Sequence, residues 1–175
     1  MIRRRLGRNG PEVSAIGLGC MSFAGFYGAT DREESFRCLD AARDLGIDFL
    51  DTAELYGMGL SEEVIGAYMA DRKATFQIAT KGGIIPKPTR HFNNSPSYFR
   101  DALEKSLKRL GVERIALYYA HRHDAEVPVE EVAGTLSRFV EEGKIDGIGF
   151  SEIAPATLRR AHAAHPVTAI QNEYS

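Results

Sequence analysis

The chain has 175 residues, 43% of them hydrophobic and 26% charged, which is ordinary for a globular protein with one core. A formal net charge of −2 argues against a general nucleic-acid-binding protein, and no segment has the roughly 20 apolar residues of a membrane span. The two cysteines, Cys20 and Cys38, suggest neither a disulfide framework nor a metal-binding spacing, so a cytoplasmic location is expected.

The N-terminal segment predicts a β-hairpin. Arg3–Leu6 is the first expected strand, Asn9-Gly10 is a strong tight-turn signal, and Val13–Ile16 returns as the second strand.

After this hairpin, short apolar runs alternate with segments of helical pattern. The expected strands are Ile16–Gly19, Ile47–Leu50, Phe76–Thr80, Ile115–Tyr119, Gly147–Phe150 and Ala169–Gln171. The expected helices are Asp31–Leu45, Ser61–Ala70, Ser95–Leu110, Val129–Glu142 and Pro155–Ala164.

Helix start and stop signals agree with this pattern. Thr30 and Glu33 form a capping box, while Ser61 and Ser95 are N-cap candidates. The expected C-terminal stops are Gly46, Gly111 and Gly143.

Regular alternation of strands and helices predicts an α/β fold with a parallel sheet. Gly17, Gly19 and Gly25 do not have the GxGxxG spacing of a doubly wound dinucleotide-binding sheet. We therefore expect one domain, residues 1–175, built as a (β/α)8 TIM barrel with an N-terminal β-hairpin. Such a barrel needs about 250 residues, so only about six of its eight units are expected, with the C-terminal portion missing.

Four polar residues, Asp51, Tyr56, Lys81 and His121, lie at or just after expected strand ends. In a parallel barrel these ends converge on the face that carries the active site. Each residue has a structural alternative. Asp51 is a possible helix cap, Tyr56 a packing residue, and Lys81 with Asp51 a structural ion pair.

Together the motifs of this chain resemble those of the aldo-keto reductases, with a helix signature similar to the bacterial and plant branches. The motifs are Gly17-Leu18-Gly19-Cys20-Met21, Asp51-Thr52-Ala53-Glu54-Leu55-Tyr56-Gly57, Ala79-Thr80-Lys81, Ser106-Leu107-Lys108-Arg109-Leu110-Gly111, His121-Arg122-His123-Asp124, Gly143-Lys144-Ile145 and Gln171-Asn172-Glu173-Tyr174-Ser175. The resemblance implies an NADP(H)-dependent reductase of aldehydes or ketones, in which the catalytic residues are Tyr56, Asp51, Lys81 and His121.

In that reading Tyr56 is the general acid. Lys81 lowers the pKa of the phenol, Asp51 keeps Lys81 charged and positioned, and His121 orients the carbonyl oxygen or relays the proton.

The resemblance also implies contacts with NADPH. The expected cofactor-binding residues are Gly19, Cys20, Met21, Asp51, Ser151, Glu152 and Gln171. Glu152 departs from the Ser-Asn pair common in the family, and an ionised carboxylate accepts hydrogen bonds but donates none. Without the resemblance, Ser151 reads equally well as a helix cap and Gln171 as a buried polar residue.

Two other patterns stay open. Phe23, Phe26 and Tyr27 form either a wall of the substrate pocket or a loop packing cluster. His121 and His123 resemble a metal pair, but no further ligand spacing supports a metal, and none is expected.

Two other functions remain as alternatives. One is an NADPH-binding regulatory subunit of the same fold, and the other is an inactive truncated fragment. In either case, ordered neighbours, another chain or the missing C-terminal half are expected to cover the sheet edges at Ile16–Gly19 and Ala169–Gln171. The sequence does not decide which small-molecule carbonyl is the substrate, or whether the protein is a homo-oligomer.

Overall fold

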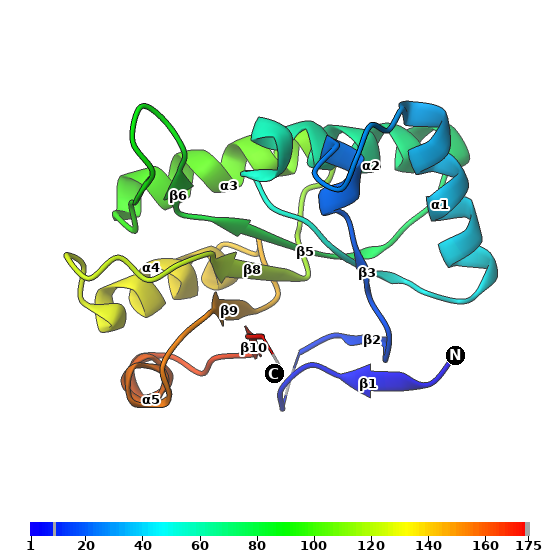
Figure 1. The fold of residues 1–175 in the computed structure, drawn as a ribbon. Coiled ribbons are helices and arrows are strands. Elements are labelled where there is room, and N and C mark those ends of the chain that lie inside the picture. The colour runs from blue at the N-terminus through cyan, green and yellow to red at the C-terminus, as the bar shows by residue number, and fades with distance from the viewer. Residues whose placement is uncertain (9, 174–175) are drawn as a thin grey trace.

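Six parallel strands form the central sheet of the computed structural model, which describes residues 1–8 and 10–173 (Figure 1). The strands are β3 (Leu18–Gly19), β4 (Phe49–Asp51), β5 (Gln77–Gly82), β8 (Leu117–Ala120), β9 (Ile148–Ser151) and β10 (Ala169–Gln171). They lie side by side in chain order, with β3 and β10 at the two edges of the described sheet. A doubly wound sheet would reverse its strand order, so this order confirms the expected partial barrel.

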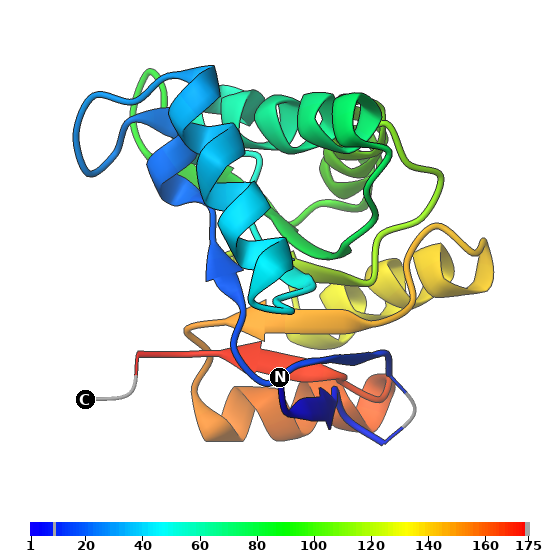
Figure 2. The ribbon, with the colours of Figure 1, turned by 90° about the vertical axis from the view of Figure 1, so that its right-hand side faces the viewer.

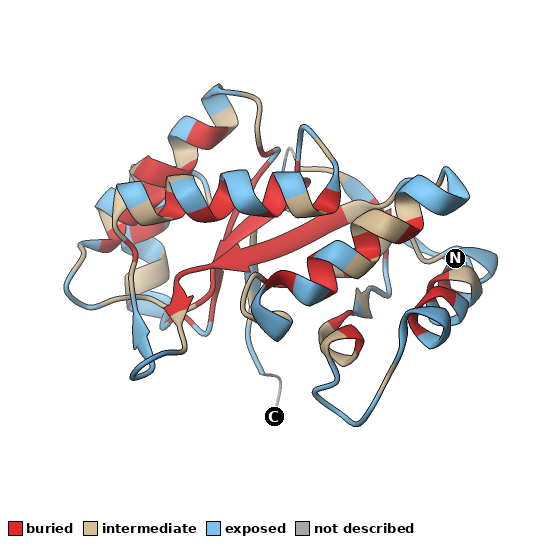
Figure 3. Ribbon diagram, turned by 90° about the horizontal axis from the view of Figure 1, so that it is seen from above, coloured by how far each residue is buried: buried red, intermediate tan, exposed pale blue. Residues whose placement is uncertain are grey.

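Five helices cover the outer face of the sheet. They are α1 (Arg32–Asp44), α2 (Leu60–Arg72), α3 (Pro96–Leu110), α4 (Val129–Glu141) and α5 (Pro155–Ala164). Figure 3 shows that buried residues concentrate in the strands and on the helix surfaces that face them. Tyr68 of α2, Phe99 of α3 and Tyr118 of β8 are fully buried between the helices and the sheet. This apolar layer holds the strand ends in fixed positions.

The opposite face of the sheet has a smaller apolar cluster made of Ala79, Leu117 and Tyr119. The Tyr119 ring lies directly over Gly149 of the next strand, where an added Cβ would come within 2.4 Å of the ring. Only glycine leaves room for the ring at this position, which explains a glycine inside a buried strand.

The predicted N-terminal hairpin is present as β1 (Arg3–Arg5) and β2 (Glu12–Ser14), paired antiparallel. Asn9 of the predicted turn lies outside the described residues. The Ser14 N–H donates to Asp48 at 2.7 Å, just before β4, and Gly7 packs against Thr168, just before β10. Figure 2 shows the hairpin beside the start of the last strand, drawn in red. The hairpin therefore lies at the N-terminal ends of the strands, opposite the end where an active site is expected.

Two predicted caps were wrong. Asp31 caps α1 in place of Thr30, because its Oδ1 accepts the Glu34 N–H at 2.7 Å. Helix α2 begins after Gly59, which leaves Ser61 inside the helix and fully buried. Ser95 caps α3 as predicted.

A short antiparallel pair after β5 was not predicted from the sequence. It consists of β6 (Ile84–Ile85) and β7 (His91–Phe92), and its turn stands beside the C-terminal ends of the strands. Two short 3-10 helices were missed as well, η1 (Met21–Ala24) and η2 (Tyr56–Gly59). Among the described residues, no helix has both the length and the apolar character needed to cross a membrane.

Candidate active site

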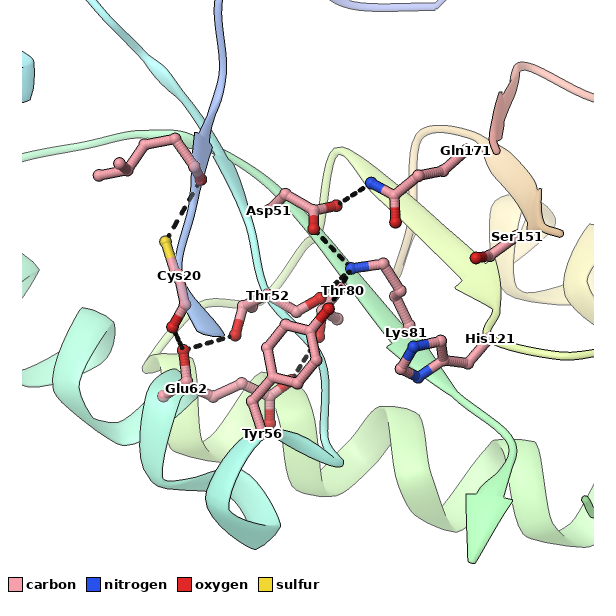
Figure 4. A network of polar contacts seen from close by, with 12 residues as sticks. Cys20, Asp51, Thr52, Tyr56, Glu62, Thr80, Lys81, His121, Ser151 and Gln171 are labelled. Carbon is pink, nitrogen blue, oxygen red and sulfur yellow. Dashed lines mark hydrogen bonds and ion pairs between the residues drawn. The ribbon is translucent and has the colours of Figure 1, made fainter. Parts of the chain in front are cut away.

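The sheet brings the predicted site residues together at the C-terminal ends of its strands (Figure 4). Each of the six strands contributes one residue at or next to its last position: Gly19, Asp51, Lys81, His121, Ser151 and Gln171. Tyr56 follows β4 at the start of η2. Residues from six separate segments thus meet because parallel strands of similar register end at the same level.

Lys81 and Asp51 form the centre of the site. The Lys81 Nζ lies 2.6 Å from Asp51 Oδ1 and donates to the Thr52 carbonyl at 2.8 Å. The Lys81 side chain is fully buried, whereas the Asp51 side chain is 19% exposed. Burial lowers the pKa of Lys81, and the adjacent Asp51 carboxylate opposes this shift. A buried ammonium without this partner would be costly, so Asp51 keeps Lys81 charged.

Tyr56 points its hydroxyl toward this ion pair. The Lys81 Nζ is 3.5 Å from the Tyr56 oxygen and 5.1 Å from the centre of its ring. The loop that carries Tyr56 is fixed by Glu54, whose N–H donates to the Lys81 carbonyl and whose carboxylate accepts from Gly83 N–H and Tyr98 Oη. Glu54 belongs to one of the motifs above, but no role was predicted for it.

The net pKa shift of Tyr56 is upward, opposite in direction to the lowering expected from the sequence. The pKa of Tyr56 is raised to about 12, first by burial and then by the negative charge of Asp51. Since Asp51 lies 2.6 Å from the Lys81 Nζ, its negative charge partly offsets the effect of the ammonium on the phenol. Tyr56 is therefore a protonated phenol at neutral pH, as a proton donor must be.

His121 completes the group beside Tyr56. The two rings meet edge to face, with centroids 6.0 Å apart. Burial, the Lys81 charge and then the Arg122 and Arg90 charges lower the pKa of His121 to about 3. Its imidazole is therefore neutral, with one donor and one acceptor nitrogen. The buried Nδ1 has no hydrogen-bond partner within the described part of the chain.

Gln171 and Ser151 lie on the other side of Asp51. The Gln171 side-chain amide donates to Asp51 Oδ2 at 2.9 Å, so both carboxylate oxygens of Asp51 are engaged. The Ser151 hydroxyl accepts from Arg122 at 3.0 Å and keeps its own hydrogen available. Arg122 also donates to the His121 carbonyl at 2.6 Å, a positioning role that the sequence reasoning missed although His121-Arg122 stood in a quoted motif.

Two of the expected cofactor contacts, Cys20 and Glu152, use polar atoms in bonds within the fold. Cys20 is fully buried, its N–H donates to the Asp51 carbonyl, and its own carbonyl accepts from Ser61. Glu152 is exposed and accepts the Glu173 N–H at 2.9 Å.

The three aromatic residues after β3 take different positions. Phe26 lines a cavity of about 550 Å³ that also borders Tyr56 and His121, and Met21 lines the same cavity. Phe23 packs in the core, whereas Tyr27 is 75% exposed and packs on Phe26. The two predicted roles, pocket wall and packing, are thus divided among the three residues.

Two buried polar residues of α2, Ser61 and Glu62, bind the segments that carry the site residues. This role was not predicted from the sequence. The Ser61 hydroxyl accepts from Thr52 and donates to Cys20, each at 2.8 Å. Glu62 accepts from Thr80 at 2.6 Å and from Arg109 at 2.7 Å. Ser61 and Glu62 are polar residues inside a helix without a partner on that helix, and this feature of the sequence could have identified them.

Comparisons with known proteins agree with this arrangement. The profile described as Aldo/keto reductase family matches residues 15–175. A Glycine max protein named probable aldo-keto reductase 1 is 45% identical, with the match covering 98% of this chain and 51% of the relative. A Schizosaccharomyces pombe protein, aldo-keto reductase yakc with NADP(+) in its name, is 43% identical over 98% of this chain and 52% of the relative.

A solved structure shares the fold as well. The holo form of aldo-keto reductase AKR11C1 from Bacillus halodurans matches with a TM-score of 0.89 and 32% identity, over 100% of this chain and 58% of that one. The chain spans about half the length of the curated relatives it matches. The chain belongs to the aldo/keto reductase family.

Proposed function

We propose that this chain carries the proton-donating site of an NADPH-dependent carbonyl reductase, which reduces an aldehyde or ketone to an alcohol. The observation that carries the proposal is the convergence of Tyr56 on the Lys81–Asp51 ion pair, with His121 beside it. Family membership supports the reaction class, and the NADP(+) in the name of the Schizosaccharomyces pombe relative supports the cofactor.

In this proposal Tyr56 is the general acid. Its pKa of about 12 keeps the phenol protonated, and an alkoxide forming on the substrate is more basic than a phenolate. The proton therefore moves from the Tyr56 hydroxyl to the substrate oxygen. The Lys81 ammonium, 3.5 Å from the phenolic oxygen, then stabilises the phenolate that is left.

His121 is assigned the orientation of the carbonyl. Because its pKa is lowered to about 3, the neutral ring donates through one nitrogen without delivering a full positive charge. A hydrogen bond from this ring to the substrate oxygen fixes the oxygen near the Tyr56 hydroxyl.

A nicotinamide cofactor would supply the hydride. Ser151 and Gln171 fit its carboxamide, because Ser151 has a free hydroxyl hydrogen and the Gln171 amide oxygen has no partner in residues 1–8 and 10–173. Gly19 and Met21 are proposed to border the cofactor at the end of β3, while Asp51 holds Gln171 and Lys81 in place.

The test is carbonyl-dependent oxidation of NADPH by the protein and by Tyr56→Phe. General acid catalysis contributes about 100-fold to 10,000-fold, so Tyr56→Phe should lose at least about 100-fold in kcat. Tyr27→Phe is the matched control, because it removes an exposed phenol from the same region of the fold and leaves Tyr56 and Lys81 in place. NADPH binding without turnover in the unchanged protein would instead favour the regulatory-subunit alternative.

A further inference from the structure

The cavity beside Tyr56 and His121 has an unusual charge pattern. Its volume is about 550 Å³, enough for a small carbonyl compound. Its apolar wall is formed by Met21, Ala24, Phe26, Leu55, Ile84 and Pro86. Its charged lining residues are Arg90 and Arg122, and no Asp or Glu of the described chain lines it.

The two arginines reach the cavity from different elements. Arg90 lies in the turn between β6 and β7, and Arg122 follows His121 after β8. Arg122 is held in place by its bonds to the His121 carbonyl and to Ser151. Neither guanidinium forms an ion pair with a carboxylate among residues 1–8 and 10–173.

Both charges act on the reacting groups. Arg122 and Arg90 each contribute to the lowered pKa of His121, and Arg122 also opposes the raised pKa of Tyr56. Both guanidinium groups line the same cavity, Arg90 from an exposed position and Arg122 from a half-buried one, so each can reach an anion bound there. Guanidinium groups present planar, paired N–H donors that match carboxylate and phosphate oxygens.

We propose that the substrate of this site is an aldehyde or ketone that also carries a carboxylate or phosphate group, and that Arg90 and Arg122 bind this anionic group. The inference rests on the proposed carbonyl reduction and adds the substrate class to it. The apolar wall then packs against the short carbon chain between the carbonyl and the anion.

Of the two arginines, Arg122 bonds Ser151, one of the residues assigned to the cofactor, whereas Arg90 has no recorded bond to any of them in the described part of the chain. Asp51, Gln171 and Gly19 border a second hollow, which shares no lining residue with the first. An anion at Arg90 is therefore expected to bind together with NADPH and not in place of it.

The first measurement is substrate preference. NADPH oxidation is compared for succinic semialdehyde and butyraldehyde, which differ by a carboxylate, and for glyceraldehyde phosphate and glyceraldehyde, which differ by a phosphate. The expected kcat/KM is at least about 10-fold higher for one anionic member than for its neutral partner, as charge-assisted hydrogen bonds of about 1.5–3 kcal/mol predict. The pair that shows this preference identifies the anionic group.

Arg90→Gln should reduce this preference about 10-fold, mainly through KM, and Arg90→Glu should reverse it. Arg90 is substituted rather than Arg122, because Arg122→Gln would also remove the hydrogen bond to Ser151. Arg37→Gln is the matched control, an exposed arginine of α1 that pairs only with Glu33 among the described residues. An equal preference in the unchanged protein and in Arg90→Gln would overturn the proposal.

A binding measurement separates this inference from the proposed reaction. Succinate, which is not reduced, is titrated calorimetrically into the protein with and without NADPH. Binding that weakens about 10-fold in Arg90→Gln, but not in Arg37→Gln, supports the anion site even if no carbonyl is turned over. Succinate that competes with NADPH, or that fails to bind although the carboxylate pair shows the preference, would contradict it.

Discussion

Replacing Asp51 with asparagine tests whether the Asp51 carboxylate stabilises the buried Lys81 ammonium, as the structure indicates. In Asp51→Asn the Lys81 ammonium keeps the Thr52 carbonyl at 2.8 Å but loses the only carboxylate recorded within ion-pair distance in the described structure. Breaking a buried pair by removing one partner costs about 3–5 kcal/mol. Since Asp51 is 19% exposed and asparagine still offers an oxygen, we expect a loss of about 3 kcal/mol in the free energy of unfolding at pH 7.

The pH dependence of this loss has a defined sign. Burial already lowers the pKa of Lys81 in the folded protein, and without Asp51 nothing of comparable strength raises it. Below the unfolded pKa of about 10.4, the unfolded chain then holds a proton more tightly than the folded chain does, which destabilises the fold. The deficit of Asp51→Asn should therefore shrink as the pH rises from 7 toward about 10.

Urea unfolding followed by circular dichroism measures these energies. The double variant Asp51→Asn with Lys81→Met places an uncharged side chain in the buried position. Its loss in the free energy of unfolding should be smaller, by at least about 2 kcal/mol, than the sum of the losses of the two single variants. A loss below about 1 kcal/mol in Asp51→Asn, or additive losses in the double variant, would refute the reasoning.

Three further outcomes are expected. Ring proton resonances of His121 should not titrate between pH 5 and 8, because its pKa is lowered to about 3; a midpoint near 6.5 in the NMR titration would contradict this. Glu62→Gln should cost about 3 kcal/mol in urea unfolding, since glutamine keeps only one of the two acceptor oxygens and leaves the Arg109 charge without its partner; a loss under 1 kcal/mol would show that the pair is not essential. Lys73→Gly should gain about 1 kcal/mol, because Lys73 ends α2 with a left-handed φ of 48°, whereas Lys73→Ala should show no such gain.

The architecture followed from local patterns in the sequence. Short runs such as Ile148–Phe150 are apolar without alternation because both faces of the parallel sheet are buried. Their spacing with helical segments predicted six strands, and all six are present. Because the residue after each strand lies at the same end of the sheet, the order of strand ends also predicted that Asp51, Lys81 and His121 would meet.

Local patterns were less reliable where a polar residue had two possible partners. Ser61 has the sequence position of a helix cap, but its hydroxyl binds Thr52 and Cys20 in the core. Which partner a hydroxyl takes depends on the groups that packing brings near it, and sequence spacing contains no information about those groups.

The sequence by itself determined the order of the strands, the hairpin below them and the four residues placed at their ends. Only the tertiary structure decided the bond between Gln171 and Asp51, 120 positions apart, the direction of the pKa shift of Tyr56, and the meeting of Arg90 with Arg122 at one cavity. Electrostatic effects depend on distance through space and on burial, and both are set by the packing of segments remote in the chain.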